Sequence, residues 1–190
     1  VALDADPGTA SRLAGYARGV SLSPGQAVEL VRWLRGKETF SGLEGARRWL
    51  LGTVAHSRPV AINYGAVNGY SEANPLVRVF FGSDEGLFHV VENTTENGVQ
   101  SGREVFAFLA PEVVGAIARR HVGVSPHRLP GYGPDGQPVI RVLDRNRDGT
   151  IDSGDGDRAF VYFGLRRGGR SYYAGDVSDP AATPRRHWRI

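Results

Sequence analysis

The feature that most limits the fold of this 190-residue chain is a series of short apolar runs that begins near residue 59. β-Branched and aromatic residues are frequent in these runs, and clusters of Gly, Asn, Asp and Pro separate one run from the next. Alternation with a period near two, bounded by turn residues, predicts β-strands. We expect a mainly β fold of antiparallel β-meanders, as in a sandwich, a barrel or a propeller. The expected strands are residues 59–64, 76–82, 86–92, 103–109, 137–143, 159–165 and 171–177.

Helical signals are few. A Ser-Pro pair can cap and start an amphipathic helix over residues 23–35, which we expect to lie outside the β region. A second, inserted helix is expected at residues 111–121, beside the strands, because Pro111 can open it and basic residues suit its C-terminal end. Residues 44–52 have a weaker helical pattern. Residues 1–12 have no periodicity, so a linker is expected there.

Composition places the chain among globular proteins. Its hydrophobic content of 41% is sufficient for a core. It contains no Met and begins at Val1, so we expect it to be a piece of a longer protein. It also contains no Cys, so neither disulfides nor thiolate metal sites are expected. We divide it into an N-terminal linker and helical segment, residues 1–50, and a β domain, residues 51–190.

The segment "DRNRDGTIDSGD", residues 144–155, has the spacing of an EF-hand calcium loop. Oxygen-bearing residues occupy positions 1, 3, 5, 7, 9 and 12, and Gly149 stands at position 6, where such a loop turns sharply. We expect one calcium ion (Ca²⁺), bound through the backbone carbonyl of position 7 and the side chains of the others, with position 12 or water completing the shell. The predicted ligands are Asp144, Asn146, Asp148, Thr150, Asp152 and Asp155.

The surroundings of this loop differ from those of an EF-hand. Expected strands, not helices, flank it, so we expect the loop at the tip of a β-hairpin. Asp155 is one methylene shorter than the usual Glu, and Arg145 and Arg147 reduce the local negative potential. Moderate calcium affinity is therefore expected. The alternative is a metal-free turn rich in Asp, Asn and Gly, which mutual repulsion among closely spaced carboxylates disfavours.

Several classes of partner and activity are not expected. The net charge is +3, the arginines are scattered, and no RNA-module signature accompanies them, so no nucleic-acid partner is predicted. No apolar run is long enough to cross a bilayer, so no membrane insertion is predicted. Asp84 and Glu85 lie between glycines and predict a hairpin turn. With no nucleophile elbow, no metal-binding pair of histidines and no phosphate loop, we expect structural histidines and no enzymatic activity.

Four blocks, in this order, carry a resemblance to a known family: "LGTVAHSRPVAI", "VRVFFGSDEGLFHVVE", "GREVFAFLAPEVV" and "FVYFGLRRGGRSYYAGDVSDP". Together they resemble the C-terminal β-propeller of the PilY and PilC family of type IV pilus tip adhesins. The resemblance covers residues 51–190 and implies the first part of a seven-bladed, modified propeller. The closing segment, residues 184–190, looks like the first strand of a next blade.

The resemblance also implies a function. The family has a calcium loop of the Asp-x-Asn-x-Asp-Gly-x-x-Asp type, which residues 144–152 match. Calcium occupancy in this family controls pilus extension and retraction, twitching motility and adhesion. Implied partners are type IV pilus components, such as minor pilins, and a host or abiotic surface. The implied location is the periplasm, the outer-membrane surface and the pilus tip (fimbrium) of an exported protein. No Arg-Gly-Asp motif is present, so receptor binding through one is not expected.

Two alternatives remain open. Quinoprotein dehydrogenases have similar blade hairpins and hold pyrroloquinoline quinone with calcium, but this chain lacks their repeated Trp-docking motif. A non-catalytic periplasmic scaffold propeller would share the fold without needing residues 144–155. We expect that neither a quinone, a nucleotide nor a haem copurifies with the protein.

Overall fold

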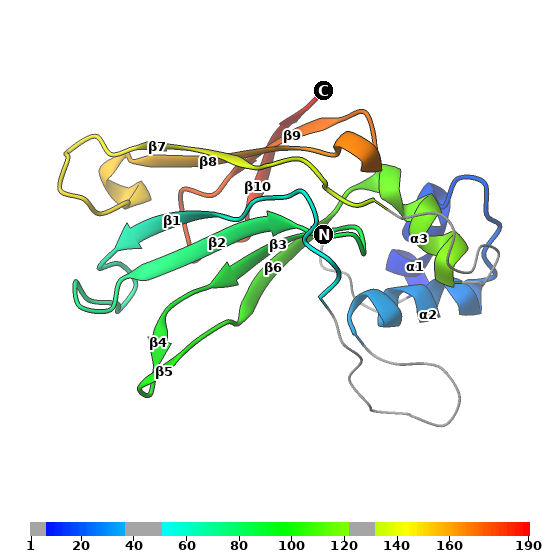
Figure 1. Cartoon of the computed structure of the whole chain (residues 1–190), viewed down its shortest axis with the longest axis horizontal. Helices are drawn as coiled ribbons and strands as arrows, with labels where there is room; N and C mark the ends of the chain where they lie inside the picture. Colours follow the sequence, from blue (N-terminus) through cyan, green and yellow to red (C-terminus); the bar gives the residue numbers. More distant parts are fainter. Residues whose placement is uncertain (1–6, 37–50, 122–131) are drawn as a thin grey trace.

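The computed structural model describes residues 7–36, 51–121 and 132–190 of the chain. In these ranges the fold is mainly β, with two antiparallel four-stranded sheets and a group of helices at one end of them (Figure 1). The first sheet has the strand order β1-β2-β3-β6, and the second has the order β10-β9-β8-β7. Both sheets are meanders, so the expected antiparallel β-meander class is confirmed. The two sheets do not close into a ring, and a propeller is therefore not confirmed.

Every expected strand is present. The first sheet contains β1 (Val60–Gly65), β2 (Leu76–Gly82), β3 (Leu87–Glu92) and β6 (Glu104–Leu109), and a small hairpin of β4 (Thr95–Glu96) and β5 (Val99–Gln100) extends from it. The second sheet contains β7 (Val139–Leu143), β8 (Arg158–Gly164), β9 (Tyr172–Asp176) and β10 (Arg185–Arg189).

The final strand corrects one prediction. We expected residues 184–190 to begin a further blade, but β10 pairs antiparallel with β9, from Arg185 opposite Asp176 to Arg189 opposite Tyr173. A turn in which the Ala182 N–H donates to the Asp179 carbonyl reverses the chain before β10. That turn returns the chain to the edge of β9, so β10 completes the second sheet.

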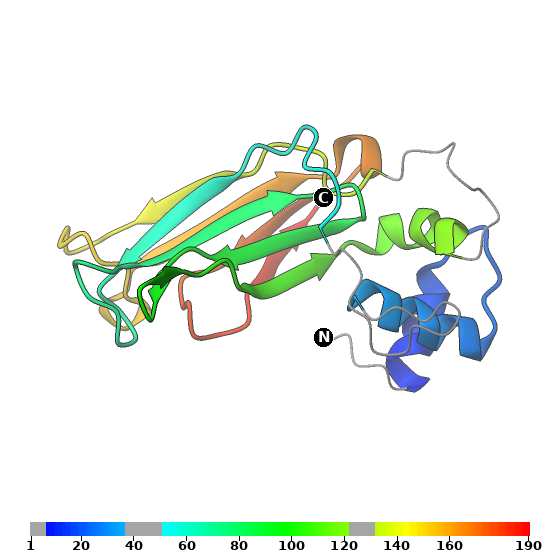
Figure 2. The same ribbon diagram turned by 60° about the horizontal axis from the view of Figure 1, so that its bottom comes forward.

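The helices gather against one end of the sheets (Figure 2). The expected helix at residues 23–35 is α2 (Pro24–Leu34), and its predicted capping box is confirmed because Ser23 and Gln26 exchange hydrogen bonds of 3.2 and 2.9 Å. The expected inserted helix is η1 (Pro111–Val113) followed by α3 (Val114–His121). Ile117 of α3 lies so close to Gly86 that a Cβ there would approach its Cδ1 to 2.4 Å.

A helix also forms where a linker was expected. Within residues 1–12, the part from Pro7 onward belongs to α1 (Pro7–Tyr16), while residues 1–6 lie outside the described ranges. Ala10 and Leu13, three residues apart on one face of α1, and Ala17 directly after the helix are buried in the common core. This apolar face gives a weak periodic signal in the sequence because two of these three residues are alanine. Most of the weakly helical segment 44–52 also lies outside the described residues.

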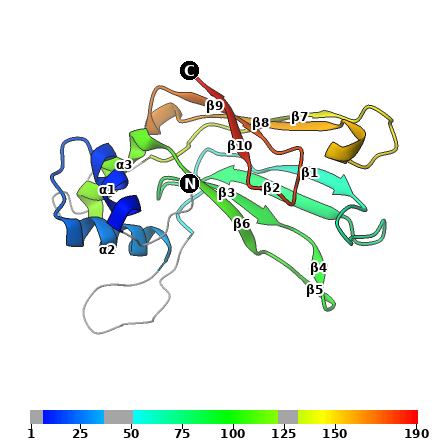
Figure 3. The ribbon, with the colours of Figure 1, turned by 180° about the vertical axis from the view of Figure 1, so that it is seen from behind.

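Aromatic side chains join the two sheets, which lie against each other with β1 beside β7 (Figures 1 and 3). Phe88 of β3 stacks on Phe163 of β8, with ring centroids 3.9 Å apart and planes inclined by 8°. Phe108 of β6 meets Phe163 and Tyr173 edge-on, at 5.9 and 5.0 Å. The interior between the sheets is therefore an apolar layer rich in aromatic rings.

We predict that Phe163→Ala lowers the free energy of unfolding by about 3–5 kcal/mol, because it leaves a cavity between the sheets. Phe160→Ala is the matched control, since Phe160 lies on the opposite face of the same strand and is only partly buried. It should cost roughly 1–2 kcal/mol. Urea denaturation measures both, and equal losses would show that the sheets do not depend on this contact.

Candidate functional site

The predicted calcium loop lies between β7 and β8, at the end of the sheets far from the helices (Figure 1). β7 and β8 pair antiparallel on either side of it, so the expectation of a β-hairpin tip is confirmed. Ile151 anchors the loop to the core: its side chain is buried, and its N–H donates to the Tyr64 carbonyl of β1 at 2.9 Å. The loop thus has a fixed base against the first sheet.

Backbone hydrogen bonds to Asp144 hold the first half of the loop in a curl. Its Oδ1 accepts from the Arg147 N–H at 2.6 Å, and its Oδ2 accepts from the Gly149 N–H at 3.0 Å. Gly149 has a φ of 81°, a conformation that L side chains rarely adopt, so its predicted role at the sharp turn is confirmed. The chain therefore curls around the Asp144 carboxylate.

Asn146, itself a predicted ligand, contacts two other predicted ligands, Asp148 and Asp155. Its Nδ2 donates to Asp148 Oδ2 at 3.0 Å and approaches Asp155 Oδ2 at 3.4 Å. These residues are positions 3, 5 and 12 of the loop. A side-chain amide hydrogen, with its partial positive charge, thus lies between two carboxylates, an environment that also favours a cation. The donor set is hard oxygen and suits calcium.

The remaining predicted ligands have other contacts. Asp152 caps η2 (Ser153–Asp155), its Oδ1 accepting from the Gly154 N–H at 2.7 Å. Thr150 is half-buried, and its N–H donates to Asp148 Oδ1 at 2.7 Å. Within the described residues, no three His, Cys, Asp or Glu side chains are arranged as metal ligands. Calcium binding therefore stays a prediction. The contacts of Asn146 with Asp148 and Asp155 identify the three predicted ligands that already lie close together.

Asp157 is a loop residue that the sequence pattern did not identify. It is fully buried, and its two carboxylate oxygens accept from the Arg145 N–H at 2.8 Å and the Asp152 N–H at 3.1 Å. These backbone hydrogen bonds hold the pKa of Asp157 below its usual value. Asp157 therefore fastens the outgoing and returning halves of the loop to each other. The available signal was a carboxylate two residues past the motif and directly before an apolar strand.

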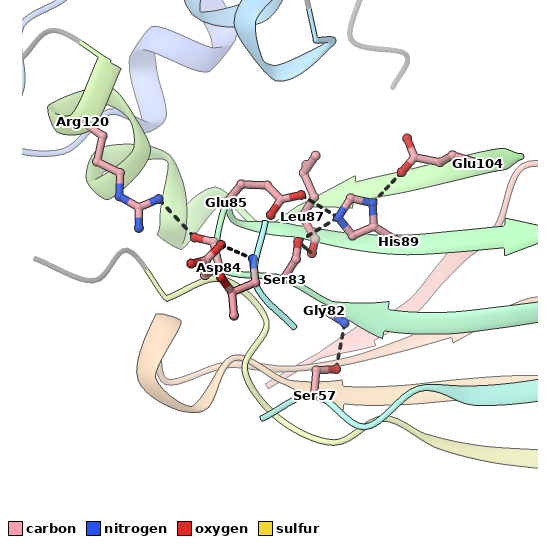
Figure 4. Close-up of polar contacts among 10 residues, drawn as sticks. Ser57, Gly82, Ser83, Asp84, Glu85, Leu87, His89, Glu104 and Arg120 are labelled. Atoms are coloured by element: carbon pink, nitrogen blue, oxygen red, sulfur yellow. Dashed lines mark hydrogen bonds and ion pairs between the residues drawn. The ribbon is translucent and has the colours of Figure 1, made fainter. Parts of the chain in front are cut away.

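A second polar cluster, near the helices, joins β3, β6 and the turn between β2 and β3 (Figure 4). His89 of β3 is buried, and its Nδ1 is 2.5 Å from Glu104 Oε2 of β6. Its Nε2 is 2.7 Å from Ser83 Oγ and 3.0 Å from Glu85 Oε1, both in the turn between β2 and β3. The turn predicted around Asp84 and Glu85 is confirmed, and one imidazole connects it to β6.

The electrostatics of this cluster favour a charged imidazole. Burial alone would lower the pKa of His89, but the hydrogen bonds and charges of Glu104 and Glu85 outweigh burial and raise it to about 9. Burial would likewise raise the pKa of Glu85, but the hydrogen bond from His89 outweighs burial and holds it below its usual value. At neutral pH the cluster is therefore an imidazolium between two carboxylates.

The order Ser83, His89, Glu104 resembles a nucleophilic triad in its distances, but its chemistry differs. A protonated His89 donates through Nε2, so it has no lone pair with which to accept a proton from the hydroxyl. Ser83 is 4% exposed, and its hydroxyl donates to the Leu87 carbonyl at 3.2 Å. The arrangement therefore connects the turn between β2 and β3 to β6 through His89.

We predict that the stability of the fold depends on pH through His89. Its folded pKa lies above its unfolded value of about 6.5, so this stabilisation is fully present below pH 6.5 and is lost as pH rises through about 9. The loss should reach up to about 3 kcal/mol, at 1.36 kcal/mol per pKa unit. Urea denaturation between pH 6 and pH 10 measures it.

His89→Gln should remove this pH dependence and cost about 3 kcal/mol at pH 7, because Glu85 stays buried without its cation. The matched control is His187→Gln, since His187 is an exposed histidine on β10. A His89→Gln protein that keeps the wild-type pH profile would exclude this role for His89.

Comparisons with known proteins give little further information. No family model matches this chain, and no curated protein matches it significantly. One solved structure is similar, the crystal structure of the Pseudomonas aeruginosa PilY1 C-terminal domain. It is 25% identical to this chain with a TM-score of 0.37, and the match covers 60% of this chain and 18% of that one. A TM-score of 0.37 is too low to establish a shared fold.

In the ranges that the structure describes, no helix is both long and apolar enough to cross a bilayer.

Proposed function

We propose that this chain belongs to an exported, calcium-binding protein of type IV pili, with no enzymatic activity, that acts in pilus extension and retraction, twitching motility and surface adhesion. The observation that carries the proposal is the curled loop at residues 144–155, in which Asn146 lies between Asp148 and Asp155. The order of the four sequence blocks supports the assignment to the PilY and PilC type. Minor pilins or other pilus components, and a host or abiotic surface, are the proposed partners.

The arrangement of strands supports a blade interpretation. Each sheet is a meander of four strands in chain order, and the first strands of the two sheets, β1 and β7, lie together. Neighbouring propeller blades pack face to face with their first strands innermost. We therefore interpret the two sheets as two consecutive blades of a propeller, whose ring requires further strands.

Calcium is the cation that these residues fit best. Asp144, Asn146, Asp148, the Thr150 carbonyl and Asp152 would hold it, with Asp155 or water completing the shell; all offer oxygen donors. Calcium accepts six to eight oxygens in flexible geometry, whereas magnesium requires a tight octahedron and zinc prefers nitrogen or sulfur. The bound ion would place two positive charges among closely spaced carboxylates. Attraction of each carboxylate to the ion would then outweigh the repulsion between the carboxylates. The hairpin between β7 and β8 should become more ordered.

We predict that the protein binds one calcium ion with a Kd on the order of 10⁻⁴ M, as in extracellular calcium modules. Asp148→Ala and Asp152→Ala should each abolish binding and leave the sheets folded, because both residues are exposed loop ligands. Calorimetric titration with calcium measures this, and circular dichroism checks the fold. Glu72→Gln is the control, since Glu72 is an exposed carboxylate outside the loop. Equal calcium binding in all four proteins, or none in the wild type at millimolar calcium, would mean that the loop is only a turn.

The cellular role requires a separate experiment. Asp148→Ala in the native organism should change the number of surface pili and twitching motility, with little change in protein level, whereas Glu72→Gln should change neither. Unaltered pili in a strain whose protein has lost calcium binding would exclude the pilus role but not the calcium site. Pyrroloquinoline quinone found by mass spectrometry of the native protein would favour the dehydrogenase alternative instead.

A further inference from the structure

A hollow of about 660 Å³ opens between the segment that leads into β1 and the start of η3 (Arg166–Gly168). It lies apart from both clusters described above, and neither the calcium loop nor His89 contributes to its wall. The polar residues that line it are His56, Ser57, Arg58, Gln137 and Arg166. A volume of this size holds a small molecule, not only a single ion.

His56 is held in position by a buried acid. Its Nδ1 is 2.8 Å from Asp135 Oδ1, and the Asp135 side chain is 7% exposed, whereas the His56 side chain is 37% exposed. The contact with Asp135 occupies Nδ1 and leaves Nε2 as the nitrogen available to a ligand. Backbone bonds from the Asp135 and Gly136 N–H groups to the Leu165 and Gly164 carbonyls fix this segment beside β8.

The charges around the hollow do not balance. The second oxygen of Asp135, Oδ2, is buried without a hydrogen-bond partner and lies 3.9 Å from the Arg166 guanidinium. Among the described residues, Arg58 has no ion pair and is exposed beside the hollow. Two arginines, Arg58 and Arg166, therefore line the hollow, and one carboxylate, that of Asp135, lies beside it, so the positive charges outnumber the negative one.

Arg166 is held in an unfavourable backbone conformation. Its φ is 49°, in the left-handed region that an L residue other than Asn or Gly rarely adopts. The neighbouring Arg167 does not line the hollow, because its guanidinium lies over the Tyr132 ring at 5.1 Å. Two adjacent arginines thus have different positions, and only the strained one faces the hollow. Strain of this kind occurs more often at binding sites than elsewhere.

We propose that this hollow binds the carboxylate or phosphate group of a small anionic molecule. The guanidinium groups of Arg58 and Arg166 present paired N–H donors suited to such oxyanions. The Gln137 amide adds neutral donors, and His56 offers Nε2 from an orientation fixed by Asp135. The site does not depend on the proposed function, because no calcium ligand lines it.

The test is titration of the whole chain with inorganic phosphate and, separately, with succinate, at constant ionic strength and observed by NMR. Binding of either anion with chemical-shift changes at His56 is the expected result, and the tighter of the two identifies the ligand class. Arg166→Gln and Arg58→Gln should each weaken binding about tenfold, the effect of losing one charge-assisted hydrogen bond.

Arg167→Gln is the matched control and should bind as the wild type does, since it alters the adjacent arginine that faces Tyr132. Urea midpoints of all variants exclude unfolding as the cause of lost binding. No binding of either anion by the wild type, or the same affinity in Arg166→Gln as in the wild type, would overturn the proposal. Asp148→Ala should retain anion binding, and this result separates the hollow from the calcium loop.

Discussion

Tyr64 makes the contacts on which the relative position of the two sheets depends. It is fully buried in β1; its carbonyl accepts from the Ile151 N–H of the loop, and its hydroxyl donates to the Val177 carbonyl just after β9 at 2.7 Å. One residue of the first sheet thus satisfies backbone groups in two segments that flank strands of the second sheet. A buried backbone group without a partner costs about 1–3 kcal/mol, so each bond specifies the alignment of the sheets as well as stabilising it.

The polar features of the chain are distributed around this apolar centre. The loop at residues 144–155 lies at one end of the sheets, and the His89 cluster lies near the helices at the other (Figures 1 and 4). Between them the interior is the aromatic layer of Phe88, Phe108 and Phe163. The loop at residues 144–155 is therefore separated from the hydrogen bonds at the opposite end of the sheets, and Ile151 connects it to the core.

The features that could be predicted from the sequence are those that a local pattern of residues determines. Strand positions, the capping box at Ser23 and the turn at Gly149 each follow from residues close together in the chain. The His89 cluster could not be predicted, because Glu104 reaches His89 only through the pairing of β3 with β6. Asp157 was missed because it lies just past the calcium motif, although it is more buried than any predicted ligand. α1 was missed because its buried residues are Thr9, Ala10 and Leu13, of which only Leu13 is a large apolar residue, so the periodic signal is weak.

The strand β10 has a consequence for solubility. All five of its residues are exposed, and three of them, Arg185, Arg186 and Arg189, are arginines of the strand at the edge of the second sheet; the Arg189 guanidinium pairs with Glu112 at 3.4 Å. An open edge offers unpaired backbone groups to the strands of other molecules, and charged side chains oppose such pairing. Because arginine stays protonated at every pH at which proteins are ordinarily handled, this protection against edge-to-edge aggregation does not weaken in alkaline solution, where a lysine-rich edge would lose its charge.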